Sequence, residues 1–159
     1  MILSRETDKD GVVYSIEKQQ LPLKGHISKL FPYKMVIFAT YVSEDYPDTY
    51  DDSGFIFETD ANPVFVCPTD HFNLLIQYPG FEEFVFSSIE EMLEKFPTLE
   101  IASEAVNKRR IEKEGYIFSL GPYCSEVAFD TGTPVKVLAL FGGKDLSGIS
   151  NKYNLPLYK

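Results

Sequence analysis

The sequence predicts an α+β domain, a mainly antiparallel sheet with one helical insertion at about residues 88–114 packed on one of its faces. Short apolar runs separated by Pro, Gly, Asn and Asp residues lie on both sides of the insertion, and within it the apolar spacing changes to that of a helix. The chain has 159 residues, of which 44% are hydrophobic and 25% charged, as in ordinary globular proteins. We therefore expect residues 1–159 to form a single domain.

The first third of the chain predicts two strands and a loop. Residues 1–10 are polar, and we expect them to be loosely ordered. Residues 12–16 follow Gly11 and are rich in β-branched side chains, which favours a strand. The continuous apolar run at residues 35–42 is typical of a central strand that is buried on both faces. Residues 43–54 are polar and predict a surface loop.

Four short apolar runs follow this loop, at residues 55–57, 64–67, 72–78 and 81–86. Turn-forming residues separate each run from the next. This spacing predicts an antiparallel meander, in which strands that are consecutive in the chain pair with each other.

The helical insertion begins with a capping box at Ser88 and Glu91, whose side chains satisfy free backbone N–H groups reciprocally. The first helix ends at Pro97, and Thr98 begins a second helix that runs to about Gly115. Four residues at helical spacing form the apolar face of the first helix and should pack on the sheet: Ile89, Met92, Leu93 and Phe96.

The last third of the chain returns to strands, which we expect at residues 116–120, 126–129 and 135–141. Residues 130–133 have the composition of a hairpin turn that would join the last two. The tail after about residue 148 has little periodicity, and we expect it to be loosely ordered.

The charge distribution carries most of the functional information. The formal net charge is −9, and the 60 residues between Lys34 and Lys95 contain no Lys or Arg. Because neutralising phosphates requires a basic face, this pattern argues against nucleic acid as a direct ligand. A basic protein partner is favoured, through electrostatic steering and complementary potential. The same stretch contains thirteen acids: Glu44, Asp45, Asp48, Asp51, Asp52, Glu58, Asp60, Asp70, Glu82, Glu83, Glu90, Glu91 and Glu94.

The loop near residues 41–52 combines tyrosines with acids inside this stretch. Tyrosine provides rigid amphipathic contact area and is enriched in interfaces, and carboxylates pair with Lys or Arg of a partner. In the alternative interpretation, the tyrosines fold back on the core and the acids only face water. The candidate partner-binding residues are Tyr41, Glu44, Asp45, Tyr46, Asp48, Tyr50, Asp51 and Asp52.

Signals for catalysis and metal binding are incomplete. Cys67, Asp70 and His71 offer three ligand types, but their spacing matches no zinc motif and no second cluster exists, which favours a structural turn. A thiol nucleophile at Cys67 or Cys124 would lack a local activating pattern.

Two loops resemble ion or phosphate sites only superficially. Residues 142–145 lack the first glycine and the final Ser or Thr of a phosphate-binding loop. Residues 48–54 contain clustered carboxylates without the ligand order of an EF-hand. We therefore expect no catalytic residue, metal or cofactor. No apolar stretch has the length of a signal peptide or membrane span, so the expected location is the cytoplasm, without membrane contact.

Residues 53–96 resemble the later half of SUKH-type bacterial immunity proteins. The resemblance rests on the glycine-led strand at 53–57, the strand after a turn at 62–66, and the serine-capped helix at 87–93, with Ile89 and Met92 where the family usually has aromatic residues. It implies a non-enzymatic protein that binds and neutralises a cognate toxin.

The leading functional hypothesis is a non-enzymatic acidic binding protein, similar to immunity proteins and antitoxins, that neutralises a basic toxin domain such as a nuclease by direct contact. Two alternatives stay open. One is a small enzyme with its site near Asp70 and His71, and the other is an adaptor domain of a larger assembly.

Overall fold

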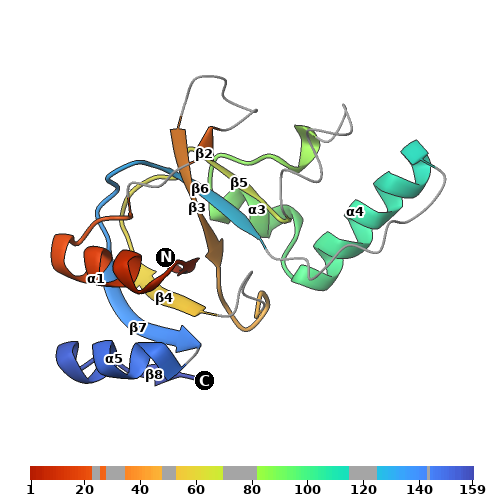
Figure 1. Ribbon diagram of the computed structural model, residues 1–159. Helices are drawn as coiled ribbons and strands as arrows, with labels where there is room; N and C mark the ends of the chain where they lie inside the picture. The colour runs from red at the N-terminus through yellow and green to blue at the C-terminus, as the bar shows by residue number, and fades with distance from the viewer. Residues whose placement is uncertain (23–25, 28–34, 48–52, 70–81, 115–124, 143) are drawn as a thin grey trace.

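The computed structural model describes the chain except residues 23–25, 28–34, 48–52, 70–81, 115–124 and 143. The described part is an α+β fold whose strands join in one mostly antiparallel sheet, with the order β5-β6-β3-β1-β4-β7-β8 and β2 paired to β3 (Figure 1). The strands are β1 (Ile2–Glu6), β2 (His26–Ile27), β3 (Met35–Tyr41), β4 (Ser53–Glu58), β5 (Phe65–Cys67), β6 (Glu126–Asp130), β7 (Lys136–Gly142) and β8 (Leu157–Tyr158). The helices are α1 (Lys9–Lys18), α3 (Ile89–Lys95), α4 (Leu99–Glu114) and α5 (Ser147–Tyr153), with short 3₁₀ turns η1 (Glu82–Phe84) and η2 (Lys144–Leu146).

The amino-terminal residues lie in the middle of the sheet, so the expectation of a loosely ordered segment at residues 1–10 was wrong. Strand β1 pairs with β4 along its whole length and with the end of β3. Leu3 is fully buried in the main core. The sequence hides this role because β1 has few apolar residues, and both of its pairing partners are remote in the chain.

Residues 12–16 belong to helix α1 and not to the predicted strand. Asp8 caps the helix, and its carboxylate accepts a hydrogen bond of 2.9 Å from the backbone N–H of Gly11. Val12 is fully buried, and Ile16, one turn later, packs on the same core. Burial of this stripe outweighs the weak preference of β-branched residues for strands.

The strand connections also differ from the predicted meander and hairpin. Strand β3 is central, as predicted, but β4 pairs with β1 and β7, whereas β5 pairs with β6. The predicted strand at residues 81–86 contains η1, and Phe86 forms only an isolated bridge with Val66. The predicted strands at 72–78 and 116–120 lie outside the described residues.

Strands β6 and β7 do not pair, although only five residues separate Asp130 from Lys136. In the sheet order β6-β3-β1-β4-β7, each strand is antiparallel to the next. Four reversals of direction therefore make β6 and β7 parallel to each other, with three strands between them. The link spans at most about 20 Å. In a flat sheet it would have to cross about 19 Å sideways and also return along a strand. The sheet is therefore strongly coiled.

The helical insertion is confirmed. Ser88 caps α3 by accepting a hydrogen bond of 3.2 Å from the Glu91 N–H. The Glu91 carboxylate accepts from the backbone N–H and the hydroxyl of Ser87, one residue earlier than the capping box predicts. All four residues of the predicted apolar face contact core clusters, which fixes α3 against the sheet: Ile89, Met92, Leu93 and Phe96.

Helix α4 packs on the aromatic side chains around α3, and beyond them it extends away from the sheet (Figure 1). Its buried residues Ala102 and Val106 contact Phe84 and Phe96 in a small second core. The tail after residue 148, expected to be loosely ordered, contains most of α5 and the strand β8, which pairs in parallel with β7.

Candidate functional site

The candidate site is built around a four-residue turn after β3. Ser43 and Tyr46 close the turn with two backbone hydrogen bonds of 3.1 and 3.2 Å, and the Ser43 hydroxyl accepts from the Tyr46 N–H. Glu44 and Asp45 lie at the tip of the turn and are exposed. The turn therefore presents two carboxylates to solvent on a fixed backbone.

Tyr46 anchors this turn to the helical insertion. Its side chain is 1% exposed, and its hydroxyl donates a hydrogen bond of 2.7 Å to the backbone carbonyl of Phe96, at the end of α3. Burial raises the pKa of the Tyr46 hydroxyl far above its usual range, so it stays a hydrogen-bond donor. Tyr46 was expected to contact a partner, but it belongs to the core instead, because its hydroxyl satisfies a buried carbonyl.

The other predicted binding residues have mixed outcomes. Tyr41 is half-buried, and its ring lies 5.9 Å from that of Tyr46. Its backbone N–H and carbonyl both bond to the hydroxyl of Ser125 on the neighbouring segment. Asp48, Tyr50, Asp51 and Asp52 lie outside the described residues.

The turn brings its two acids next to acids that are remote in the sequence. The backbone carbonyl of Asp45 accepts a hydrogen bond of 3.0 Å from the N–H of Leu99, which begins α4. Apart from Glu91, whose carboxylate is bound to Ser87, four further exposed acids lie within two helical turns of this α3–α4 junction. We call the set the acidic surface: Glu44, Asp45, Glu90, Glu94, Glu100 and Glu104.

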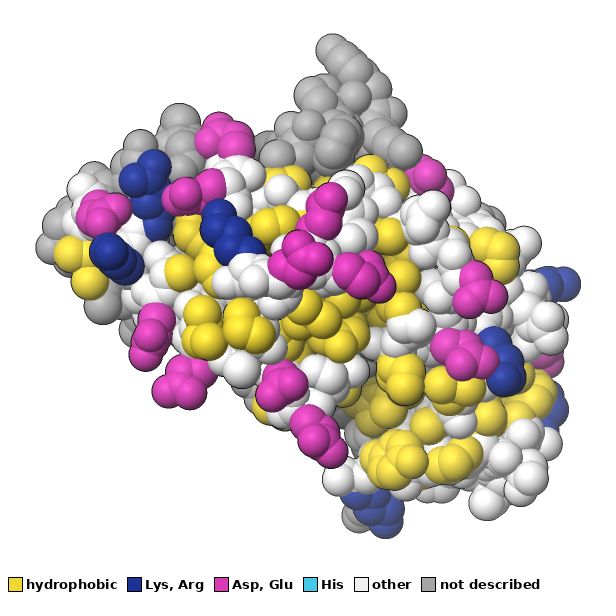
Figure 2. All heavy atoms as spheres, turned by 180° about the vertical axis from the view of Figure 1, so that it is seen from behind, with side chains coloured by type: hydrophobic (Ala, Val, Ile, Leu, Met, Phe, Trp, Pro, Cys, Tyr) yellow, Lys and Arg dark blue, Asp and Glu magenta, His cyan; other side chains and the backbone are white. Residues whose placement is uncertain are grey.

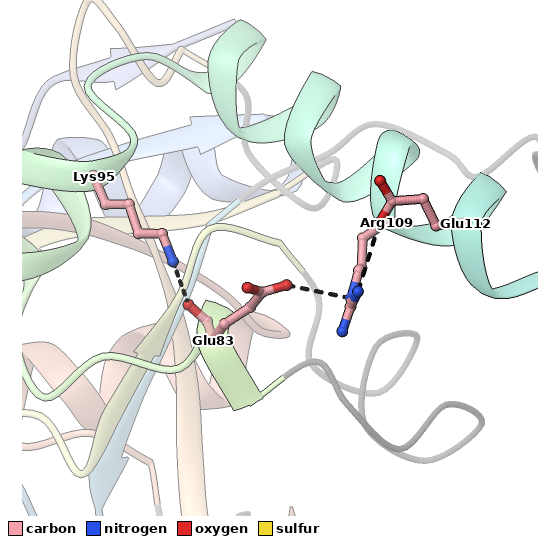
Figure 3. A network of polar contacts seen from close by, with 4 residues as sticks. All are labelled: Glu83, Lys95, Arg109 and Glu112. Atoms are coloured by element: carbon pink, nitrogen blue, oxygen red, sulfur yellow. Dashed lines mark hydrogen bonds and ion pairs between the residues drawn. The ribbon is translucent and has the colours of Figure 1, made fainter.

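Two basic side chains of this region are engaged elsewhere (Figure 3). The Lys95 ammonium donates to the backbone carbonyl of Glu83 at 3.1 Å and lies 5.4 Å from the centroid of the Phe96 ring. Arg109 pairs with the Glu83 carboxylate at 3.3 Å and with Glu112 at 3.6 Å. Within the described ranges, no residue of the acidic surface has an ion pair.

Seen from behind, the molecule shows acidic side chains across the middle of its surface, with apolar side chains between them (Figure 2). One exposed apolar residue belongs to the junction itself. Ile101 lies between Glu100 and Glu104 on α4 and is 43% exposed. In protein interfaces, an apolar contact area is typically surrounded by a rim of polar or charged side chains. Ile101 and the carboxylates near it have this arrangement.

A second feature, which the sequence did not reveal, is an open groove of about 440 Å³ between the start of α1 and η2. Lys9 and Asp145 face each other across 3.5 Å in it, and both are well exposed. Its members come from three distant segments, so no local pattern announces it. The groove is lined by Thr7, Asp8, Lys9, Asp10, Ser53, Asp145 and Leu146.

Of the Cys, Asp and His candidates for chemistry, only Cys67 lies among the described residues. Asp70, His71 and Cys124 lie outside the described residues, and Cys67 is buried. Among the residues with a described placement, no three His, Cys, Asp or Glu side chains are grouped so that they could hold a metal ion. In that same part of the chain, no helix has the length and apolar character needed to cross a membrane.

Comparisons with known proteins found no matching family model, no similar curated protein and no similar solved structure.

Proposed function

We propose that the chain is a non-enzymatic binding protein that holds a basic protein partner on the acidic surface. The observation that carries the proposal is a set of six exposed carboxylates around one helix junction. Two of the basic side chains nearby, Lys95 and Arg109, are bound to Glu83 instead. Uncompensated charge of one sign raises the association rate of a partner of opposite sign.

Fixed geometry supports the same function. Asp45 lies on a turn that is closed by its own hydrogen bonds and tied to Leu99, and Glu100 follows in the first turn of α4. A surface that is already ordered loses less conformational entropy when it binds. The exposed Ile101 side chain would supply apolar contact between these charges.

The partner we propose is a toxin domain with a basic substrate-binding face, such as a nuclease. An enzyme that binds nucleic acid needs Lys and Arg side chains to neutralise phosphates. Such a face is complementary to an acidic surface, and covering it would block the substrate. The resemblance of residues 53–96 to SUKH-type immunity proteins implies the same role.

The test measures binding to the protein encoded by the reading frame next to the gene of this chain. It compares two matched double variants of this chain. Asp45→Lys with Glu100→Lys changes the acidic surface, and Asp10→Lys with Asp60→Lys changes exposed acids elsewhere. Each pair makes the net charge four units more positive, from −9 to −5. The first pair should slow association about tenfold or more at low ionic strength, and the second should have little effect.

Association is measured by surface plasmon resonance at about 20 and about 200 mM salt, where screening differs strongly. The rate for the unchanged chain should fall steeply with salt, and inhibition of the toxin should follow binding. Equal association rates for the two double variants would show that the acidic surface is not the interface. Absence of binding to the neighbouring product would refute the toxin assignment.

A further inference from the structure

The helix α4 has an exposed side that faces away from the protein's own core. On its inner side, Ala102 and Val106 pack against Phe84 and Phe96. Figure 1 shows that α4 extends away from the sheet beyond this contact. At 3.6 residues per turn, the residues opposite Ala102 and Val106 form one stripe about 80° wide. All four of its members are exposed, and we call them the α4 stripe: Ile101, Glu104, Lys108 and Ile111.

The spacing of the α4 stripe is that of a coiled-coil seam. Its members are three, four and three residues apart, as at successive a and d positions of a heptad repeat. The two ends are apolar, and the side chains of Ile101 and Ile111 are 43% and 47% exposed. The two central members are an acid and a base. In the part of the chain that the structure describes, neither Glu104 nor Lys108 has an ion pair. The stripe therefore offers apolar area together with one uncompensated charge of each sign.

We propose that the α4 stripe binds α4 of a second copy of this chain, antiparallel and across a twofold axis beside Val106. A twofold interface places the same patch on both sides, so that residue i contacts j and j contacts i. Ile101 and Ile111 are equally distant from Val106 along the helix, so each faces the other's equivalent in the second copy. Glu104 and Lys108 are also equally distant from Val106, so each acid faces a base.

The two charges select both the orientation and the register of this helix pair. In a parallel pair, each charge would lie beside the same charge of the other helix and repel it. If the antiparallel pair slid by four residues, about one helical turn, either Glu104 or Lys108 would face its own equivalent. The antiparallel pair centred on Val106 brings opposite charges together and covers all four isoleucines.

The composition of the stripe favours a second copy over the basic partner of the proposed function, on which this dimer does not depend. A strongly basic protein would be repelled by Lys108. Each copy has a net charge of −9, but repulsion between copies is screened beyond about 8 Å at physiological salt. Since α4 has 16 residues, the contact is only about 24 Å long. We therefore expect a weak dimer, with a dissociation constant on the order of 100 µM. It covers Ile101 and Glu104, so the dimer and the partner complex compete.

Sedimentation velocity of the whole chain tests the association without any partner, from about 10 µM to about 1 mM at about 150 mM salt. The unchanged chain should dimerise. Ile111→Lys should weaken the dimer at least about tenfold, since it leaves a charge in an apolar contact. Tyr158→Lys is the matched control, because Tyr158 is 58% exposed on β8 and should have no effect. An unchanged chain that stays monomeric to about 1 mM would overturn the proposal, and so would a dimer that Ile111→Lys leaves intact.

A charge exchange tests the antiparallel pairing itself. Glu104→Lys and Lys108→Glu, each alone, set like charges against each other and should dissociate the dimer. Glu104→Lys changes the net charge of each copy from −9 to −7, which by itself would favour association, so weakening would have to come from the local pairing. Both side chains are exposed, so the variants should fold.

An equimolar mixture of the two variants should restore the dimer, because the lysine introduced in one chain then faces the glutamate introduced in the other. Mixing cannot restore an ion pair within one helix, since each chain keeps its two like charges. The double variant Glu104→Lys/Lys108→Glu should dimerise like the unchanged chain. A mixture no more dimeric than its separate components would refute the antiparallel pairing and with it the proposal.

Discussion

The Tyr46 hydroxyl offers the sharpest test of how the candidate site is built. Tyr46→Phe removes one oxygen and leaves the Phe96 carbonyl without the partner that it has at 2.7 Å. Both residues are buried, with exposed fractions of 1% and 4%. Leaving a buried acceptor unsatisfied costs about 1–3 kcal/mol, so the free energy of unfolding should fall by about that amount. Tyr46→Ala also removes a buried ring and should cost about 3–5 kcal/mol.

Urea unfolding followed by circular dichroism measures both losses, and it suits a chain without tryptophan. Tyr158→Phe is the matched control, because that side chain is 58% exposed and should be neutral. The slope of the free energy against urea should not change in the Tyr46→Phe variant. A Tyr46→Phe protein within about 0.5 kcal/mol of the unchanged chain would show that the hydroxyl does not anchor the turn.

Three further outcomes follow from the same region. Phe96→Ala should lower the free energy of unfolding in urea by about 3–5 kcal/mol, whereas Ser88→Ala should lower it by only about 0.5–2 kcal/mol. Partner binding should survive the Ser88→Ala change. A Phe96→Ala protein of unchanged stability would contradict the packing of Phe96. Hydrogen bonds from the Ser87 hydroxyl and N–H lower the pKa of Glu91, so its stabilising effect should be present at neutral pH and disappear as pH falls through that lowered pKa. The unfolding midpoints of Glu91→Gln and the unchanged chain should therefore differ at pH 7 and converge in acid; a constant difference would contradict this. Added salt should raise the unfolding midpoint in proportion to the screening of the acidic surface, and less so in the Asp45→Lys/Glu100→Lys variant.

Local signals in the sequence were sufficient for α3 and β3. Ser88 and its apolar residues at helical spacing determine α3 within ten positions, and an uninterrupted apolar run identifies β3. Helix α1 was missed because Val12 and Ile16 favour strands, and only burial against β4 and β7 reverses that preference. Strand order was mispredicted because β1 and β4 find partners far along the chain, which no turn signal encodes.

The sequence predicted two exposed acids of the candidate site and missed the contacts that place them. The sequence places Glu44 and Asp45 in an acidic stretch, and both are exposed. It gives no sign that Leu99 holds their turn beside Glu100, since that contact joins segments more than 50 residues apart. Tyr46 was misassigned for the same reason, because a tyrosine among acids looks identical whether its hydroxyl faces a partner or the Phe96 carbonyl.

The acidic surface has a cost in stability that the proposed binding function would explain. Like charges around one junction repel each other, and this repulsion opposes the packing that Tyr46 and Phe96 provide. The chain could lower the cost by directing Lys95 or Arg109 toward these carboxylates, but both contact Glu83 instead. Folded proteins retain such unfavourable features mainly at functional sites, where stability is exchanged for recognition. Reversing Glu94 and Glu104, which lie outside the first turns of α3 and α4, should therefore stabilise the free chain while it weakens the complex. A variant that lost both stability and binding would identify these acids as structural.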